Sequence, residues 1–244
     1  MTKKAPCSVT PRQDYLECEK TWVFAMLMGV GGFLGAFTYV LRGGVFCNAQ
    51  TGNLVLLAMA LGEGNWSRAL YLLLPITAYF LGAVVSEVIA GPIKKFHLIR
   101  WDTLFIILEI IAILVLGLLP ETAPYQITQI TVNFICSMQY NTFRQAQGIP
   151  MATTFCTNHL RQLAVWFTKF VKHRTQPEKV RFLSHLLMLA VFVAGGFVST
   201  ILCHLLRGKA IFFALIPLII ILIDFLYADL KTEKGDLSRV PRGH

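Results

Sequence analysis

Amides and hydroxyls interrupt an otherwise apolar sequence at two places. The first group follows the glycine-rich stretch Gly31-Gly32-Phe33-Leu34-Gly35, and the second lies about 106 residues further along the chain. Both groups come just before a short predicted helix, whose unpaired N–H groups and partial positive charge suit an anionic or strongly dipolar ligand. The candidate ligands for such a solute are Asn48, Gln50, Thr51, Gly52, Asn53, Asn141, Thr157, Asn158, His159 and Arg161.

A second interpretation of these side chains is structural. They can cap broken helices and bind one another without holding any solute. The matched polarity of the two groups, in which Thr154 belongs to the second, favours a binding site.

Two charged residues lie within or beside apolar runs. Glu109 is in the middle of residues 104–119 and is the deepest carboxylate of the chain. It is a candidate proton-coupling group; pairing with Arg161, or a protonated or amide-paired structural role, is the alternative. Arg161 lies one turn into a short helix, where lipid exposure would cost roughly 2.5–3.5 kcal/mol. We expect Arg161 to face a wet cavity or to lie near the cytoplasmic surface.

The sequence offers no pattern of an enzyme. No nucleophile and base stand at a recognisable spacing, and no phosphate-binding or dinucleotide-binding fingerprint is present. The six cysteines are scattered, and no His, Cys, Asp or Glu cluster has metal-ligand spacing. We therefore expect no catalytic residues, no metal and no cofactor.

The composition is that of a membrane protein. Of 244 residues, 55% are hydrophobic and 14% are charged, with a mean hydropathy of +0.61, whereas ordinary globular domains carry about 25% charged residues. The formal net charge of +9 comes from basic residues in short segments between apolar runs. Positive-inside loops and anionic lipid headgroups explain that charge better than nucleic acid does.

The fold class expected is all-α, because strands would leave open edges in lipid. The apolar or partly apolar runs cover residues 22–41, 54–61, 69–91, 104–119, 127–143, 153–171, 182–206 and 210–227. Around them we divide the chain into a cytoplasmic tail (1–21), a first transmembrane repeat (22–120), a second repeat (121–230) and a C-terminal tail (231–244). The final residues resemble a protease-site and tag scar.

Charge placement indicates six full spans. If the short polar segments 48–61 and 153–171 both crossed the membrane, Lys94, Lys95 and Arg100 would lie outside, against the positive-inside rule. If both segments enter and return on one side, those residues and both termini lie in the cytoplasm. The second segment is long enough to be a full pore-lining helix, so a full span stays open for it.

The chain also repeats. A shift of 106 residues places Thr51 on Thr157 and Leu54 on Leu160, and a shift of 113 then places Gly82 on Gly195 and Ser86 on Ser199. Such matches predict a duplication. Because each copy would have three full spans, the second copy would be inverted relative to the first. The Gly82 and Ser86 pair, and its counterpart, are predicted packing faces.

Two motifs carry a family resemblance. Gly32-Phe33-Leu34-Gly35-Ala36 leads through Phe46 to Thr51-Gly52-Asn53-Leu54, and Met138-Gln139-Tyr140-Asn141-Thr142 leads to Thr157. Over most of residues 22–228 the chain resembles the YoaK family, small bacterial inner-membrane proteins of uncharacterised function. The family commonly has an acidic residue where Gly35 stands. A weaker likeness, through the Gly31–Ala36 stretch, is to fluoride channels. The resemblance implies a location in the bacterial inner membrane.

The expected function is a membrane transporter or channel for a small anionic or polar solute, with its site between the repeats near the bilayer midplane. The alternatives are a membrane protein that binds a lipid or a partner protein, and a fluoride-channel-like pore. The expected partners are the lipid bilayer and the solute, with a homo-oligomer left open and no nucleic acid.

Overall fold

The computed structural model describes residues 15–93 and 99–237, together with residues 239 and 241. The basic loop residues Lys94 and Lys95, most of the N-terminal tail and most of the last five residues lie outside the described residues. The helices are α1 (Thr21–Leu41), α2 (Gln50–Gly62), α3 (Trp66–Ile93), α4 (Trp101–Leu118), α5 (Tyr125–Thr142), α6 (Thr157–His173), α7 (Gln176–Leu206) and α8 (Leu215–Tyr227). A small antiparallel hairpin, β1 (Gln145–Ala146) and β2 (Ile149–Pro150), follows α5. Short helical turns flank α1 and α8, at Glu17–Glu19, Arg207–Ala214, Ala228–Thr232 and Lys234–Asp236.

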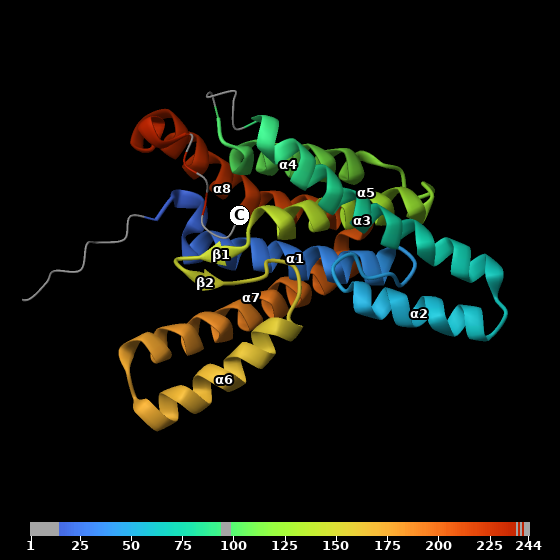
Figure 1. Cartoon of the computed structure of the whole chain (residues 1–244). Coiled ribbons are helices and arrows are strands. Elements are labelled where there is room, and N and C mark those ends of the chain that lie inside the picture. The colour runs from blue at the N-terminus through green and yellow to red at the C-terminus, as the bar shows by residue number, and fades with distance from the viewer. Residues whose placement is uncertain (1–14, 94–98, 238, 240, 242–244) are drawn as a thin grey trace, which may run out of the picture.

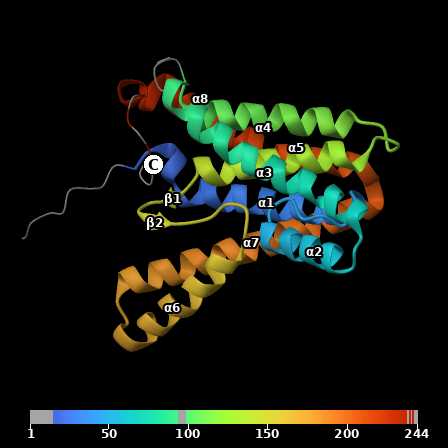
Figure 2. The ribbon, with the colours of Figure 1, turned by 45° about the vertical axis from the view of Figure 1, so that its right-hand side comes forward.

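The long helices form a bundle in which α1 lies along the centre (Figures 1 and 2). Many of its apolar side chains are enclosed, with Phe24, Leu27 and Phe37 at 1% exposure or less. Phe143, just after α5, packs edge-on against Phe24 and Phe105. One apolar core therefore joins α1, α4, α5 and α8, as expected of helices that are apolar on the faces they bury.

Two helix pairs make the closest contacts of the bundle, α1 with α7 and α3 with α5. Both depend on glycine. A Cβ on Gly195 would lie 2.1 Å from the Gly29 carbonyl oxygen, and one on Gly82 would lie 2.4 Å from that of Phe134. Small residues at such positions allow backbones to approach closely.

Helices α2 and α6 are short elements that pack as hairpins against the helices that follow them, α3 and α7. Both views show the two hairpins leaving the bundle at opposite ends (Figures 1 and 2). Each short helix follows a loop that returns the chain from the end of a long helix toward the middle of the bundle.

A network of buried charge fastens the chain ends together. The Asp229 carboxylate accepts the Arg100 backbone N–H at 3.0 Å and the Thr103 hydroxyl at 2.6 Å. The Arg100 guanidinium lies 3.1 Å from Glu233, which also accepts the Glu17 backbone N–H. The turns at both ends of the described chain are thereby tied to the start of α4.

Four stretches within the described residues are long and apolar enough to cross a membrane: 21–41, 66–89, 101–118 and the 57-residue stretch 176–232, which contains α7 and α8. The chain is a helical membrane protein. Helix α5 is not among these stretches because amides and hydroxyls occupy its buried face.

The two largest differences between predicted and observed helix starts are at α7 and α8. Helix α7 begins at Gln176, six residues before its apolar run, because Thr175 and Glu178 form a capping box that starts it in polar sequence. Helix α8 begins at Leu215 rather than residue 210, after two turns of 3₁₀ helix. Pro217 then falls in the first turn of α8, where its missing N–H is tolerated.

Candidate functional site

The first polar group folds onto its own loop. Asn53 is fully buried, and its side chain donates to the Phe46 carbonyl at 2.7 Å and accepts the Phe46 N–H at 3.3 Å. Asn48 is also buried and donates to the Gly31 carbonyl of α1 at 2.8 Å. A Cβ on Gly35 would lie 2.8 Å from the Asn48 amide nitrogen, so the glycines of α1 make room for this loop.

Gln50 connects the same group to α5. Its amide donates to the Asn133 side chain at 2.7 Å and accepts from Asn53 at 3.2 Å. Asn133 in turn donates to the Gln129 backbone carbonyl, and the Gln129 side chain donates to the Arg42 carbonyl. A chain of amides therefore runs from the first short helix along α5 to the end of α1.

The second loop reaches the same place on α1 from the other side. A Cβ on Gly31 would lie 2.7 Å from the Thr153 carbonyl oxygen, which accepts the Gln139 amide of α5 at 3.3 Å. Gly31 is the middle residue of α1, and it contacts Asn48 of one loop and Thr153 of the other. We call this convergence the central polar seam, formed by Gly31, Asn48, Gln139, Thr153 and Thr154.

Several oxygens of the central polar seam are buried and have no hydrogen-bond partner among the residues that the structure describes. They are the side-chain oxygens of Gln139, Thr153 and Thr154. All three residues are fully buried. A buried polar group without a partner costs roughly 1–3 kcal/mol. A polar ligand in the seam would supply the missing hydrogen bonds and recover that free energy.

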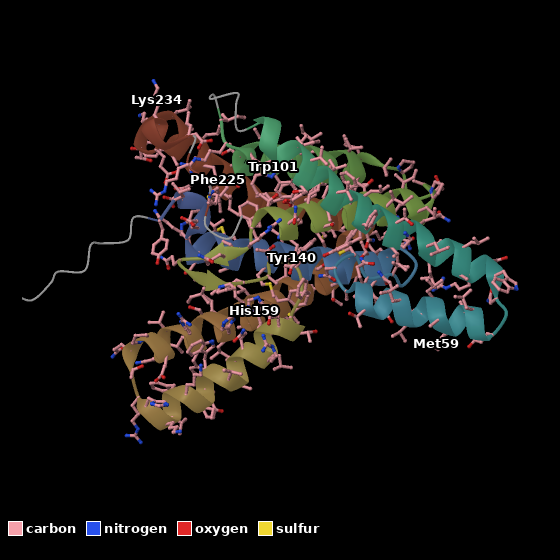
Figure 3. The ribbon with its side chains drawn as sticks, viewed as in Figure 1. Met59, Trp101, Tyr140, His159, Phe225 and Lys234 are labelled. Atoms are coloured by element: carbon pink, nitrogen blue, oxygen red, sulfur yellow. The ribbon has the colours of Figure 1, made fainter. Side chains whose placement is uncertain are left out.

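His159 holds the second loop to α7. Its Nε2 lies 2.9 Å from the Ala152 carbonyl, and its Nδ1 lies 3.0 Å from Nδ1 of His185. Because a carbonyl only accepts, Nε2 carries the proton, and Nδ1 of the neutral ring accepts the Nδ1–H of His185. Figure 3 shows His159 where α6 meets the rest of the molecule. Its role here is to position the loop that carries Thr153.

A pocket of about 460 Å³ opens beside the seam at one end of the bundle. Asn141 and Asn158 line it, as do Arg144 and Ala152. The Arg144 guanidinium lies 2.8 Å from Glu87 and donates to the Asn141 side chain at 2.6 Å. The pocket therefore offers amides and a paired cation next to the loop that ends in the seam.

A second polar pocket of about 310 Å³ lies at the other end of the bundle, where Arg42, Glu121, His204 and Arg207 are among its lining residues. Arg42 is only 3% exposed and lies over the rings of Phe37 and Tyr125. Its carbonyl is the end of the amide chain along α5. Polar groups thus connect pockets at both ends with the centre.

The remaining candidates lie outside the seam. Thr51 and Thr157 are exposed, and Gly52 packs near the Phe46 ring. Arg161 is exposed and donates to Asn158 at 3.1 Å.

Glu109 is fully buried in α4, and neither of its oxygens has a hydrogen-bond partner among the described residues. The alternative in which Glu109 pairs with Arg161 is wrong, because Arg161 turns to Asn158 on the surface.

The sequence reasoning included Asn141 of α5 among the candidates but missed a further polar face of that helix. Gln129, Asn133 and Ser137 recur every four residues and so share one buried face of a helix. That spacing was visible in the sequence. The contact between the Cys47 and Cys136 thiols, at 3.8 Å, had no comparable signal because the residues are 89 positions apart.

Among the described residues, no group of three or more His, Cys, Asp or Glu side chains is arranged to hold a metal ion. No curated protein and no solved structure matches the chain. A family model described as a protein of unknown function, DUF1275, matches residues 23–223, which run from the start of α1 into α8. The chain belongs to the DUF1275 family, whose function is unknown.

Proposed function

We propose that this protein is a transporter or channel that moves a small anionic or polar solute through the central polar seam. The observation that carries the proposal is the set of buried seam oxygens without partners, on Gln139, Thr153 and Thr154. A protein that needed these groups only for stability would gain by making them apolar. Here two loops and α5 bring them together instead.

The path would run from the pocket at Asn141 and Asn158, through the seam, to the pocket at Arg42. The described state has a polar pocket at each end and a packed centre. Passage therefore requires the loops of residues 42–49 and 150–156 to separate from α1. Glycines at positions 31 and 35 provide the close contact that such a movement would open and close.

We further infer six full spans, α1, α3, α4, α5, α7 and α8, with α2 and α6 entering and returning. Two inverted repeats are part of this proposal. In support, α1 pairs with α7 as α5 pairs with α3, and the matched glycines Gly195 and Gly82 lie in those two contacts. The motif resemblance to the YoaK family, and an inner membrane with both termini in the cytoplasm, belong to the same proposal.

The solute chemistry follows from the groups available. The seam contributes hydroxyls, a carboxamide oxygen and backbone carbonyls, and each pocket adds an arginine. Hydroxyls donate to an anion and carboxamides bind polar solutes in either direction. Glu109, buried without a partner, is the group that would carry a proton if transport is proton-coupled.

The test is a thermal-shift screen of purified protein with inorganic anions, fluoride among them, and small polar metabolites, followed by uptake into liposomes. A ligand at 100 times its Kd stabilises by about 2.7 kcal/mol. We expect Thr153→Val and Thr154→Val to remove the ligand shift and the uptake. Without ligand they should keep or raise the melting temperature, because each removes an unpartnered hydroxyl.

The matched control is Thr38→Val, which changes an equally buried threonine whose hydroxyl only bonds carbonyls of its own helix. It should leave uptake unchanged. Unaltered uptake by both seam variants would refute the proposed path, and a large loss of unliganded stability in them would assign the seam a structural role. Asn53→Leu is a poor probe, because Asn53 holds the Phe46 backbone.

A second candidate function, binding a lipid, rests on a different feature. An apolar groove of about 470 Å³ lies between α3, α4 and α5, where Val85, Leu108 and Phe134 are among its lining residues. Leu108→Trp would fill this groove. Loss of a copurifying lipid in that variant, measured by native mass spectrometry, together with no uptake of any tested solute by the unaltered protein, would favour this function.

A further inference from the structure

We propose that the end of the α6–α7 hairpin is a binding surface for anionic phospholipid headgroups. This surface, which we call the basic hairpin end, covers residues 166–181. Figures 1 and 2 show the hairpin extending away from the bundle, so this end is free of contacts with the other long helices. The inference is independent of solute transport.

The charge of the surface is strongly one-sided. The basic hairpin end has one acidic residue, Glu178, and five Lys or Arg residues: Lys169, Lys172, Arg174, Lys179 and Arg181. Glu178 is already engaged, because it accepts the Thr175 hydroxyl at 2.8 Å as part of the helix cap. The counterpart at the other end of the molecule, the α2–α3 turn at residues 63–68, carries one acid and one base, Glu63 and Arg68.

Exposed apolar side chains lie at the same level as the cations. Phe167 is 51% exposed, Val171 is 56% exposed and Val180 is 54% exposed. Exposure to water is unfavourable for these apolar side chains. A surface that only binds water or soluble anions would also not need apolar groups beside its cations. A lipid interface satisfies both, since acyl chains cover the apolar groups and headgroups meet the charges.

Trp166 is placed as an interfacial anchor. The Lys169 ammonium lies 4.3 Å from the centroid of its ring, and the Arg181 guanidinium lies 4.5 Å from it. The indole thereby holds cations from both helices of the hairpin in one cluster. Tryptophan with basic residues is the usual composition of a helix end at a membrane surface.

The geometry also separates two sides of α6. At 100° per residue, Lys169 and Lys172 lie on one side of the helix with Thr168, whereas Phe167 and Val171 lie on another. Between these sides, Phe170 and Trp166 face α7, where Phe170 stacks on Phe182. The helix therefore presents cations and apolar groups on different exposed sides, as a helix at a lipid boundary does.

The test compares phosphatidylglycerol with phosphatidylcholine as additives to the full-length protein in detergent, measured by lipid adducts in native mass spectrometry and by melting temperature. Each cation near an anionic surface is worth about fivefold in affinity. We expect Lys169→Gln with Lys172→Gln to weaken phosphatidylglycerol binding about 25-fold and to leave phosphatidylcholine binding unchanged. Binding of phosphatidylglycerol to the unaltered protein should also fall with added salt.

The matched control is Arg68→Gln with Lys209→Gln, two exposed cations at the other end of the bundle. This pair should retain phosphatidylglycerol binding. Equal loss in both double variants, or no preference for phosphatidylglycerol in the unaltered protein, would overturn the assignment. Because Lys169 and Lys172 lie outside the central polar seam, solute uptake by the test variant reports separately on the proposed transport function.

Discussion

Adding one methyl group at Gly195 should separate α1 from α7, whereas adding it at the next residue should not. A Cβ on Gly195 would lie 2.1 Å from the Gly29 carbonyl oxygen, and a Cβ on Gly196 would lie 3.5 Å from that of Gly32. The first distance requires the backbones to move apart by about 1 Å to reach an ordinary contact. A backbone carbonyl cannot rotate away as a side chain would.

The magnitudes follow from this geometry. Overpacking of this kind costs about 3 kcal/mol at the upper end of its range, and replacing a helical glycine by alanine returns about 1 kcal/mol. The net loss for Gly195→Ala is therefore about 2 kcal/mol, or about 4–8 °C in melting temperature for a chain of this size. Gly196→Ala gains the helix propensity of alanine without a clash, so we expect its melting temperature to rise by about 2–4 °C.

The assay is thermal unfolding of both variants in the same detergent, followed by fluorescence-detected size exclusion. Equal melting temperatures for the two variants would refute the reasoning that the α1–α7 contact is set by this glycine. A fall for both would show that any added bulk is harmful in this helix.

Three further outcomes follow from other contacts. Asp229→Ala should destabilise the protein by about 3–5 kcal/mol, since it leaves the buried Arg100 charge without that partner; a melting temperature equal to that of the unaltered protein would contradict this. Oxidation with copper phenanthroline should form a disulfide between Cys47 and Cys136, whose sulfurs lie 3.8 Å apart. The disulfide would fix the loop of residues 42–49 to α5 and should stop uptake. Mass spectrometry detects the link, and uptake that persists when linking is complete would contradict the proposed movement of that loop. Burial, and next the neighbouring Asp102 carboxylate, raise the pKa of the Cys18 thiol well above its usual range. Its iodoacetamide labelling at about pH 8 should therefore be slower than that of glutathione and should still increase above about pH 9, whereas equal rates would contradict the burial.

Most helix positions could be predicted from the sequence because the lipid core offers no hydrogen-bond partners to the backbone. Long apolar runs must be helical to satisfy their own N–H and C=O groups, and α1, α3 and α4 lie within three residues of their predicted starts and ends. The start of α7 was also in the sequence, as Thr175 followed three residues later by Glu178, but a hydropathy pattern does not detect a polar cap.

The partners of the site residues could not be predicted in the same way. A buried amide needs donors and acceptors, but sequence does not say which ones. Asn53 finds the backbone of Phe46, seven residues away, while Gln50 finds Asn133, 83 residues away. Polarity located the two loops, and only the packing of α1 against both of them shows where they converge.

Positions related by the sequence repeat carry different chemical groups near the seam. The shift of 106 residues that relates the two short helices places Gly31 of α1 on Ser137 of α5 and Asn48 on Thr154. Related positions thus carry a bare backbone in one helix and a hydroxyl in the other. Two loops can reach Gly31 because it has no side chain, whereas Ser137 lies beside Gly82 of α3, on the side of α5 away from Gln139. In the proposed transporter, α5 would therefore contribute Gln139 and α1 would contribute the contacts that open and close, so the two proposed repeats would take unequal parts in the site. Adding a side chain to Gly31 should block loop closure, and Ser137→Ala should leave solute binding unchanged.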